Sequence, residues 1–116
     1  MPVVVTDDLE IGYGVVKPQL ALYVGGMGAR ERNFYNQLAC RYGYEGEAKV
    51  VQDLYLAGRK AEAEAAVPDA LVDDVALCGP RERIRERLTQ WTSAGVTTLM
   101  IGGDVAALRV MAELTR

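Results

Sequence analysis

The stretch that decides the fold runs from Val75 to Ile101 and reads VALCGPRERIRERLTQWTSAGVTTLMI. Its first residues, Val75–Cys78, form a continuous apolar run, which is typical of a parallel strand covered on both faces. Its last residues, Val96–Ile101, are β-branched or apolar and predict a second strand. The residues between them predict a helix, so the stretch indicates a parallel βαβ unit.

The helix of this unit has a start signal, an apolar face and a stop signal. Pro80 is expected at the first helical position, where its missing N–H would have had no helical partner. Ile84, Leu88 and Trp91 recur at helical spacing and give one apolar stripe among arginines and glutamates. Gly95 can adopt the left-handed conformation that commonly ends a helix.

The N-terminal residues predict a third strand and a weaker helix. Pro2–Val5 is a short β-branched strand, and a helix is expected to begin near Leu9. Gly12 and Gly14 should each weaken this helix by about 1 kcal/mol relative to alanine. Pro18 should kink or restart it.

The remaining chain predicts further helices. Glu45–Val67 reads as two short helices separated at Gly58, and Pro68–Asp74 as a turn of helix leading into the strand at Val75. After the last strand, Asp104 is a suitable N-cap for a final helix.

Four runs of this sequence resemble the C-terminal part of luciferase-like oxidoreductases, and most closely the branch that uses the deazaflavin coenzyme F-420. The resemblance covers nearly the whole chain, from about Val3 to Leu114. The YVGGMG run followed by NFYN is its most specific part. The four runs are LALYVGGMG at 20–28, NFYN at 33–36, LCGPRERI at 77–84 and AGVTTL at 94–99.

The resemblance implies an α/β fold that is the C-terminal portion of a TIM (β/α)8 barrel. The three predicted parallel strands would be its sixth, seventh and eighth. A full barrel takes roughly 200 residues or more, whereas this chain has 116. We therefore expect one incomplete domain over residues 1–116, with no separate second domain. Unpaired strand edges invite other chains, so the expected partner is the missing N-terminal half of the barrel or another copy of this chain.

Composition narrows the class of protein. Half of the residues are hydrophobic and a quarter are charged, as in a globular domain. The net charge of −3, with arginines interspersed among glutamates, argues against a nucleic-acid partner. No apolar run approaches the roughly 20 residues of a membrane span, and the N-terminus does not resemble a secretion signal, so a cytoplasmic protein is expected.

The two cysteines show no metal-binding spacing, and the chain has no histidine. Cys40 and Cys78 are therefore expected to be reduced, small apolar groups. Cys78 has the better functional claim because it ends a predicted strand, where a barrel places its active-site mouth. No neighbouring base is evident, and no metal site is expected.

Two glycine clusters are candidates for binding a cofactor. Gly79, Gly102 and Gly103 follow the last two predicted strands, where barrels often hold phosphate and where helix starts can bind an anionic group. Glycine could equally serve only the tight turn there, and Asp104 would repel an anion. Gly25, Gly26, Met27 and Gly28 could let a cofactor approach the backbone. A turn between helices is the preferred interpretation of that run.

By resemblance, the function is hydride or oxygen chemistry on a small-molecule substrate with coenzyme F-420, or alternatively FMN. The cofactor carries such chemistry while the protein binds and orients it. Most of the cofactor site would come from strands that this chain lacks, so the isolated chain is expected to be inactive, and no catalytic residue is identified. Two alternatives remain: a non-catalytic remnant or assembly module that packs against a partner, and a small phosphate-binding βα domain.

Overall fold

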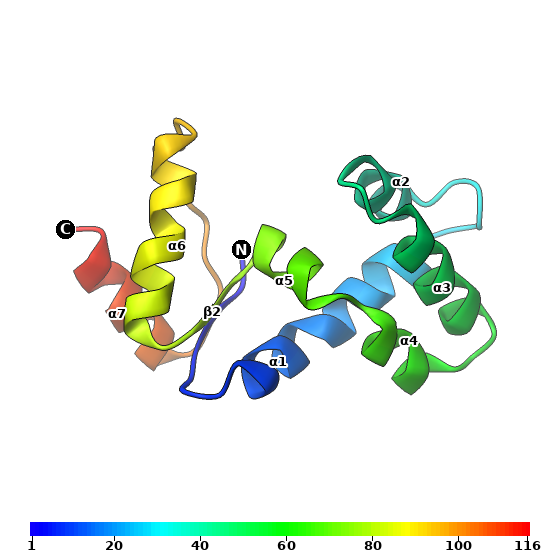
Figure 1. The fold of residues 1–116 in the computed structure, drawn as a ribbon, viewed down its shortest axis with the longest axis horizontal. Coiled ribbons are helices and arrows are strands. Elements are labelled where there is room, and N and C mark those ends of the chain that lie inside the picture. The colour runs from blue at the N-terminus through cyan, green and yellow to red at the C-terminus, as the bar shows by residue number, and fades with distance from the viewer. The chain divides into compact units, whose positions relative to one another are not determined.

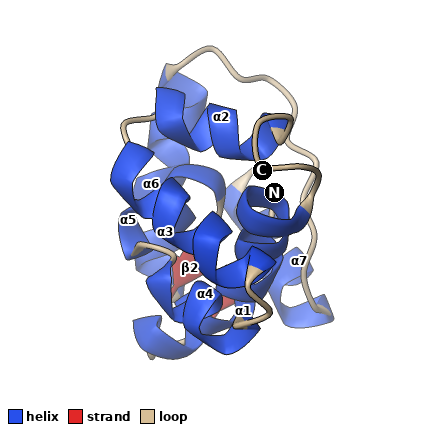
Figure 2. Ribbon diagram, turned by 90° about the vertical axis from the view of Figure 1, so that its right-hand side faces the viewer, coloured by secondary structure: helices blue, strands red, loops and turns tan.

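The computed structural model describes residues 1–116 and consists mainly of helices, with a small parallel sheet (Figures 1 and 2). It divides into two compact units. The strand unit comprises Met1–Val15 and Val75–Arg116, and the helical unit comprises Val16–Asp74. In chain order the elements are β1 (Val3–Val5), α1 (Leu9–Ala21), the π-helix η1 (Leu22–Gly26), α2 (Phe34–Arg41), α3 (Glu45–Leu56), α4 (Lys60–Ala66), α5 (Asp69–Val75), β2 (Leu77–Gly79), α6 (Arg81–Ser93) and α7 (Val105–Leu114).

The sheet of the strand unit pairs β1 with β2 in parallel, and Val4 lies opposite Cys78. The expectation of parallel strands near the N-terminus and after Val75 is confirmed, although Val75 itself ends α5 and β2 begins at Leu77. Both strands are buried or half-buried, because helices α6 and α7 pack against them.

The prediction of a third strand at Val96–Ile101 is wrong. Residues Val96–Ile101 are extended between α6 and α7 but form no ladder, and only an isolated parallel bridge joins Pro2 to Gly102. This bridge lies on the side of β1 away from β2, so β1 occupies the middle of the small sheet. Because no further strand pairs with residues 96–101, their backbone lacks the second neighbour that would hold them in a regular ladder.

The core of the strand unit lies between this sheet and its two helices. Trp91, Leu99 and Ile101 pack around it and are half-buried. The fully buried members are Val3, Leu77, Ile84, Leu88, Ala107 and Met111. The apolar stripe predicted for α6 therefore faces the core as expected.

The predicted helix boundaries hold with small shifts. Asp104 caps α7 by accepting the N–H of Ala107 at 2.8 Å, and Gly95 follows α6 with a φ of +90°. Pro80 is the N-cap of α6, one position earlier than expected.

Helix α1 differs more from expectation, because it continues through Pro18 without a break. Pro18 is exposed, so water can solvate the carbonyl that has no helical partner.

The helical unit is held together by η1, α2, α3 and α4, which contact one another. Asn33 is fully buried and donates to the carbonyl of Val24, in the middle of η1. Asn36 donates to the same carbonyl and to that of Ala48, which joins η1 to α3. None of the helices has both the length and the apolar character needed to cross a bilayer.

Candidate functional site

Three loops of the strand unit leave the sheet on the same side, and we call this side the carboxyl edge. They are Thr6–Asp8 after β1, Gly79–Pro80 after β2, and Gly102–Asp104 before α7. The N–H of Thr6 donates to the carbonyl of Gly79 at 3.0 Å, so the first two loops are tied together. Ligands of open α/β sheets bind at the carboxyl ends of the strands, which makes this edge the candidate site.

The three helices that begin at the carboxyl edge differ in how their first turns are capped. Asp8 accepts the N–H of Glu10 at 3.0 Å at the start of α1, and Asp104 fills the same role in α7. A carboxylate already occupies both helix starts, and its charge repels a second anion. Pro80 offers no side-chain cap to α6. The start of α6 is thus the position at this edge best suited to an anionic group.

An arginine–tyrosine pair, in which Arg83 is half-buried and Tyr13 is buried, lies beside that position. Arg83 of α6 donates from Nη1 to the carbonyl of Cys78 at 2.7 Å and from Nη2 to the hydroxyl of Tyr13 at 3.2 Å. Its guanidinium also lies over the ring of Tyr13, 6.0 Å from the centroid, a cation–π arrangement. The pair brings positive charge to the end of β2 and anchors α1 to it.

Sequence reasoning missed this pair. The charge pattern of residues 81–87 predicts a solvated face that includes Arg83, and Tyr13 lies between the two glycines expected to weaken its helix. Gly12 was the available signal, because a Cβ there would lie 3.3 Å from Cβ of Cys78 and 3.1 Å from Cγ2 of Thr6. The glycine lets α1 lie close to β2, and this brings Tyr13 to Arg83.

The glycines predicted after the strands do gather at the carboxyl edge. Gly79 has a φ of +120°, and a Cβ on Gly103 would lie 2.7 Å from the carbonyl oxygen of Val3. These two glycines are therefore required by turn geometry and close packing. Gly102 faces open space. A role of any of the three in binding a cofactor stays a prediction.

The second glycine cluster lies in the helical unit. A Cβ on Gly25 or Gly26 would lie 2.6 or 2.5 Å from side-chain atoms of Tyr55, so both residues allow η1 to pack on α3. Met27 is exposed, and Gly28 begins the following turn with a φ of +132°. Their candidacy for a cofactor also stays a prediction.

The cysteines form no disulfide. Cys78 is fully buried at the strand end, and its thiol donates to the carbonyl of Gly12 at 3.8 Å. Cys40 is half-buried in α2, with its sulfur 3.7 Å from Oδ1 of Asn36. No group of three or more Cys, Asp or Glu side chains is arranged to hold a metal ion.

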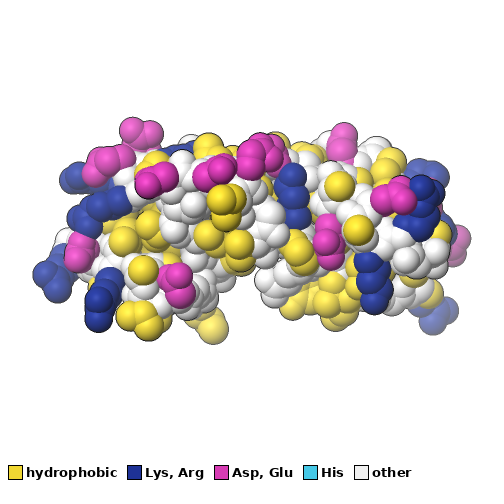
Figure 3. Space-filling model, turned by 90° about the horizontal axis from the view of Figure 1, so that it is seen from below, with side chains coloured by type: hydrophobic (Ala, Val, Ile, Leu, Met, Phe, Trp, Pro, Cys, Tyr) yellow, Lys and Arg dark blue, Asp and Glu magenta, His cyan; other side chains and the backbone are white.

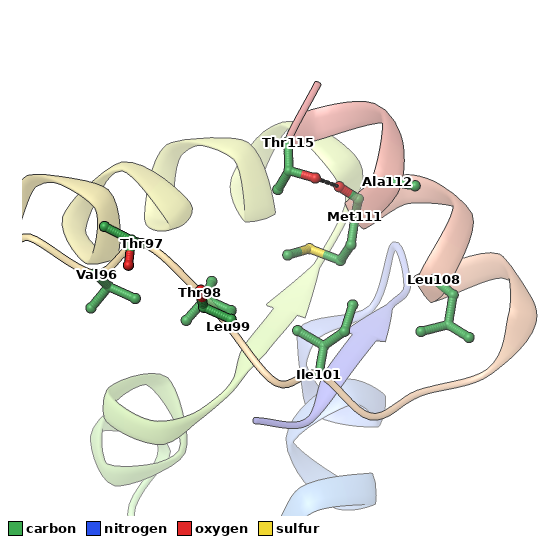
Figure 4. Close-up of a pocket in the computed structure, with 9 residues that line it drawn as sticks. All are labelled: Val96, Thr97, Thr98, Leu99, Ile101, Leu108, Met111, Ala112 and Thr115. Carbon is green, nitrogen blue, oxygen red and sulfur yellow. Dashed lines mark hydrogen bonds between the residues drawn. The ribbon is translucent and has the colours of Figure 1, made fainter.

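A pocket of about 400 Å³ opens elsewhere in the strand unit, between the extended residues 96–101 and α7. Figure 4 shows Met111 reaching from α7 toward the extended segment, and a hydrogen bond of 2.7 Å from the Thr115 hydroxyl to the Met111 carbonyl. None of the side chains that line the pocket is charged. The lining residues are Val96, Thr97, Thr98, Leu99, Ile101, Leu108, Met111, Ala112 and Thr115.

The surface charges show no one-sided basic patch on the face drawn in Figure 3, where acidic and basic side chains alternate among apolar ones. Arg81 forms an ion pair with Glu113, and this lowers the pKa of that carboxyl group below its usual range. Arg81 is thus already paired with an acid near the start of α6.

These observations test how well the chain suits a deazaflavin or flavin, which combines an anionic tail with a flat ring. The start of α6 beside Arg83 suits the tail. The pocket described above lies between α7 and the segment that precedes Gly102, and no residue at the start of α6 lines it. The residues present therefore fit only part of such a cofactor.

Comparison with known proteins places the chain in a family. Residues 2–98 match the family model of the luciferase-like monooxygenases. The chain is also 41% identical, over 113 residues, to a Mycobacterium tuberculosis protein named as a presumed coenzyme F-420-dependent oxidoreductase. The aligned region is 97% of this chain but 33% of that relative, so the chain spans about one third of its length. No solved structure matches the chain. The family match and the identity together show that the chain belongs to the luciferase-like monooxygenase family.

Proposed function

We propose that this chain is the C-terminal segment of a luciferase-like oxidoreductase that uses coenzyme F-420, or alternatively FMN, and that it works with a polypeptide supplying the remaining strands of a (β/α)8 barrel. Membership of the family supports oxidoreductase chemistry. The chain spans about one third of the relative that is named as dependent on this coenzyme, which supports the need for a complementing polypeptide.

The observation that carries the proposal is the arrangement at the carboxyl edge. Of the three helix starts there, only that of α6 has no carboxylate cap, and it is the one next to Arg83. The chain would contribute the position that holds the cofactor's anionic tail. The bound cofactor would supply the hydride or oxygen chemistry, and the ring and the small-molecule substrate would lie mainly against the complementing polypeptide.

Completing a barrel requires a change of strand neighbours. Each strand of a (β/α)8 barrel lies beside the strands before and after it in sequence, whereas here β1 lies between β2 and Gly102. Residues 96–101 would have to leave Met1–Val3 and pair with β2. Trp91 packs against the adjoining core, so its fluorescence should change when the complementing polypeptide binds.

One observation favours a second candidate, a non-catalytic module that only packs against a partner. Asp8 and Asp104 occupy two of the three helix starts, and the backbone of Val3 fills the space that Gly103 leaves. Such an edge is better suited to packing than to an open cofactor cradle.

Titration with oxidised F-420, and separately with FMN, distinguishes the two candidates. The isolated chain should not bind, whereas the chain together with a polypeptide matching the remaining two thirds of the relative should bind and change the cofactor's absorbance. Arg83→Gln should weaken this binding by about tenfold, the loss of one charge-assisted contact worth roughly 1.5 kcal/mol.

Arg85→Gln is the matched control, because Arg85 lies on the same helix, is exposed and makes only a 4.0 Å contact with Glu82. Trp91 fluorescence checks that both variants fold. If neither cofactor binds even with the complementing polypeptide present, the non-catalytic module replaces the oxidoreductase.

A further inference from the structure

The two outer edges of the sheet in the strand unit are treated differently, and the edge at β2 is closed. Leu77 donates its N–H to Pro2, and Gly79 accepts from Thr6, so both face β1. Backbone groups alternate in direction along a strand, so those of Cys78 face away from β1. On that side, the carbonyl of Cys78 accepts a hydrogen bond of 2.7 Å from the guanidinium of Arg83.

The opposite edge is open. The carbonyl of Met100 accepts the ammonium of Met1 at 2.8 Å, and Gly102 exchanges hydrogen bonds of 2.9 and 2.8 Å with Met1 and Val3. The same alternation directs the backbone groups of Leu99 and Ile101 away from β1. They make no hydrogen bond within the chain. We call residues Thr97–Ile101 the open edge.

The open edge lacks the features by which proteins usually protect an unpaired strand. Natural edges carry charged residues or proline, whereas no residue from Val96 to Gly103 is charged or a proline. Met100 is 86% exposed, and on α7 the side chains of Val105 and Leu108 are 63% and 44% exposed. The apolar pocket adjoins the same segment (Figure 4).

We propose that the open edge pairs with the open edge of a second copy of this chain, antiparallel, about a two-fold axis at Met100. In this register Leu99 of each copy lies opposite Ile101 of the other. Both residues direct their backbone groups outward, so each pair exchanges both of its N–H···O bonds. The two Met100 residues then face each other as a non-hydrogen-bonded pair, and the contact uses the same patch on both copies.

The sequence around the axis makes the edge complementary to itself. Thr97 lies opposite Gly103 and Val96 opposite Asp104, so no carboxylate faces another carboxylate. A two-fold axis perpendicular to the sheet keeps both α7 helices on one face. The apolar layers of the two pockets therefore meet across the axis. The inference does not rest on the proposed cofactor chemistry. It applies to the chain without a complementing polypeptide, because residues 96–101 pair with the second copy while they stay beside Met1–Val3.

Disulfide trapping tests the register. In a Cys40→Ala background, Met100→Cys should give a covalent dimer under mild oxidation, because the Cα atoms of a non-hydrogen-bonded pair lie about 4.5 Å apart, within disulfide range. Thr98→Cys is the matched control. Thr98 is also exposed, but its two copies would be offset by about 14 Å along the strands. Cys78 is fully buried and should not react.

Sedimentation of the purified chain tests the dimer itself. The expected mass is twice 12.6 kDa. Met100→Lys should return the chain to a monomer, because like charges would face each other across the axis, whereas Met100→Leu should leave it a dimer. A monomer at all concentrations, an open-ended oligomer, or equal cross-linking of Thr98→Cys and Met100→Cys would overturn the proposal.

Discussion

The helical unit and the strand unit obtain their order in different ways. In the helical unit, amide side chains join elements that are close in sequence. Asn33 reaches Val24, nine residues away, and Asn36 reaches Ala48, twelve residues away. These hydrogen bonds all lie within one continuous stretch of chain. Contacts between residues close in sequence form quickly during folding.

In the strand unit, by contrast, order depends on residues that are distant in sequence. The ammonium of Met1 donates to the carbonyl of Met100, 99 residues away. The sheet that results is short, and one of its edges stays open. The comparison shows that the helices of an α/β chain can be complete while its short sheet leaves one edge without a neighbouring strand. We therefore expect the two units to lose their structure at different denaturant concentrations.

The largest expected effect comes from Leu77→Ala, which breaks the core of the strand unit. Leu77 is fully buried between the sheet and α6, and truncation of a buried leucine costs about 2–5 kcal/mol. Trp91, the only tryptophan of the chain, lies in this unit and reports its unfolding in urea by fluorescence. The tyrosines at 23, 35, 42, 44 and 55 report on the helical unit.

Leu56→Ala is the control for that experiment, because Leu56 is 46% exposed at the end of α3. Its truncation should change the free energy of unfolding by no more than about 0.5 kcal/mol. A Leu77→Ala variant whose tryptophan and tyrosine transitions shift together would contradict the separation into two units.

The next effect concerns the close approach that ties the two ends of the strand unit together. A Cβ on Gly103 would lie 2.7 Å from the carbonyl oxygen of Val3 and 2.9 Å from Cβ of Ala107. Gly103→Ala should therefore lower the free energy of unfolding by about 1–3 kcal/mol, the usual cost of overpacking. Gly102→Ala, one residue earlier and facing open space, is expected to have little effect. Urea unfolding followed at Trp91 measures both variants, and equal losses would refute the packing role of Gly103.

The sequence predicted the helices better than it predicted the strands. Caps and stops such as Asp104 and Gly95 act through their nearest neighbours in the chain, so their positions could be read from local residue types. Whether Val96–Ile101 becomes a strand depends on a neighbouring strand, which no local pattern specifies. The same limit applies to the strand order, in which β1 lies beside both β2 and Gly102.

The sequence located the glycines of the carboxyl edge but not the contact between the Arg83 and Tyr13 side chains. Loops after parallel strands are a general feature of the fold class, so Gly79, Gly102 and Gly103 could be located from strand positions alone. The contact between Arg83 and Tyr13 joins residues 70 positions apart and depends on how closely α1 approaches β2. Six of the first seven residues of α6 are charged, and this pattern gives no sign of which arginine turns inward.

The smallest expected effect belongs to the helical unit and depends on pH. The hydroxyl of Tyr44 donates to Asp74 at 2.7 Å, and this hydrogen bond, with partial burial and the nearby carboxylates, raises the tyrosine pKa from 10.0 to about 12. Because the folded state holds this proton more tightly than the unfolded state, the contribution is fully present below pH 10 and is lost as pH rises toward about 12.

Tyr44→Phe should therefore lower the free energy of unfolding by about 0.5 kcal/mol at neutral pH, the low end for a hydrogen bond because the pair is largely exposed. It should also remove part of the decline in stability of the helical unit above pH 10. Urea titrations followed by circular dichroism at several pH values measure both effects. Tyr42→Phe is the control, since Tyr42 is 53% exposed and its hydroxyl has no hydrogen-bond partner. If both variants flatten the alkaline decline equally, general tyrosine ionisation and not the Tyr44–Asp74 bond sets the pH dependence of the helical unit.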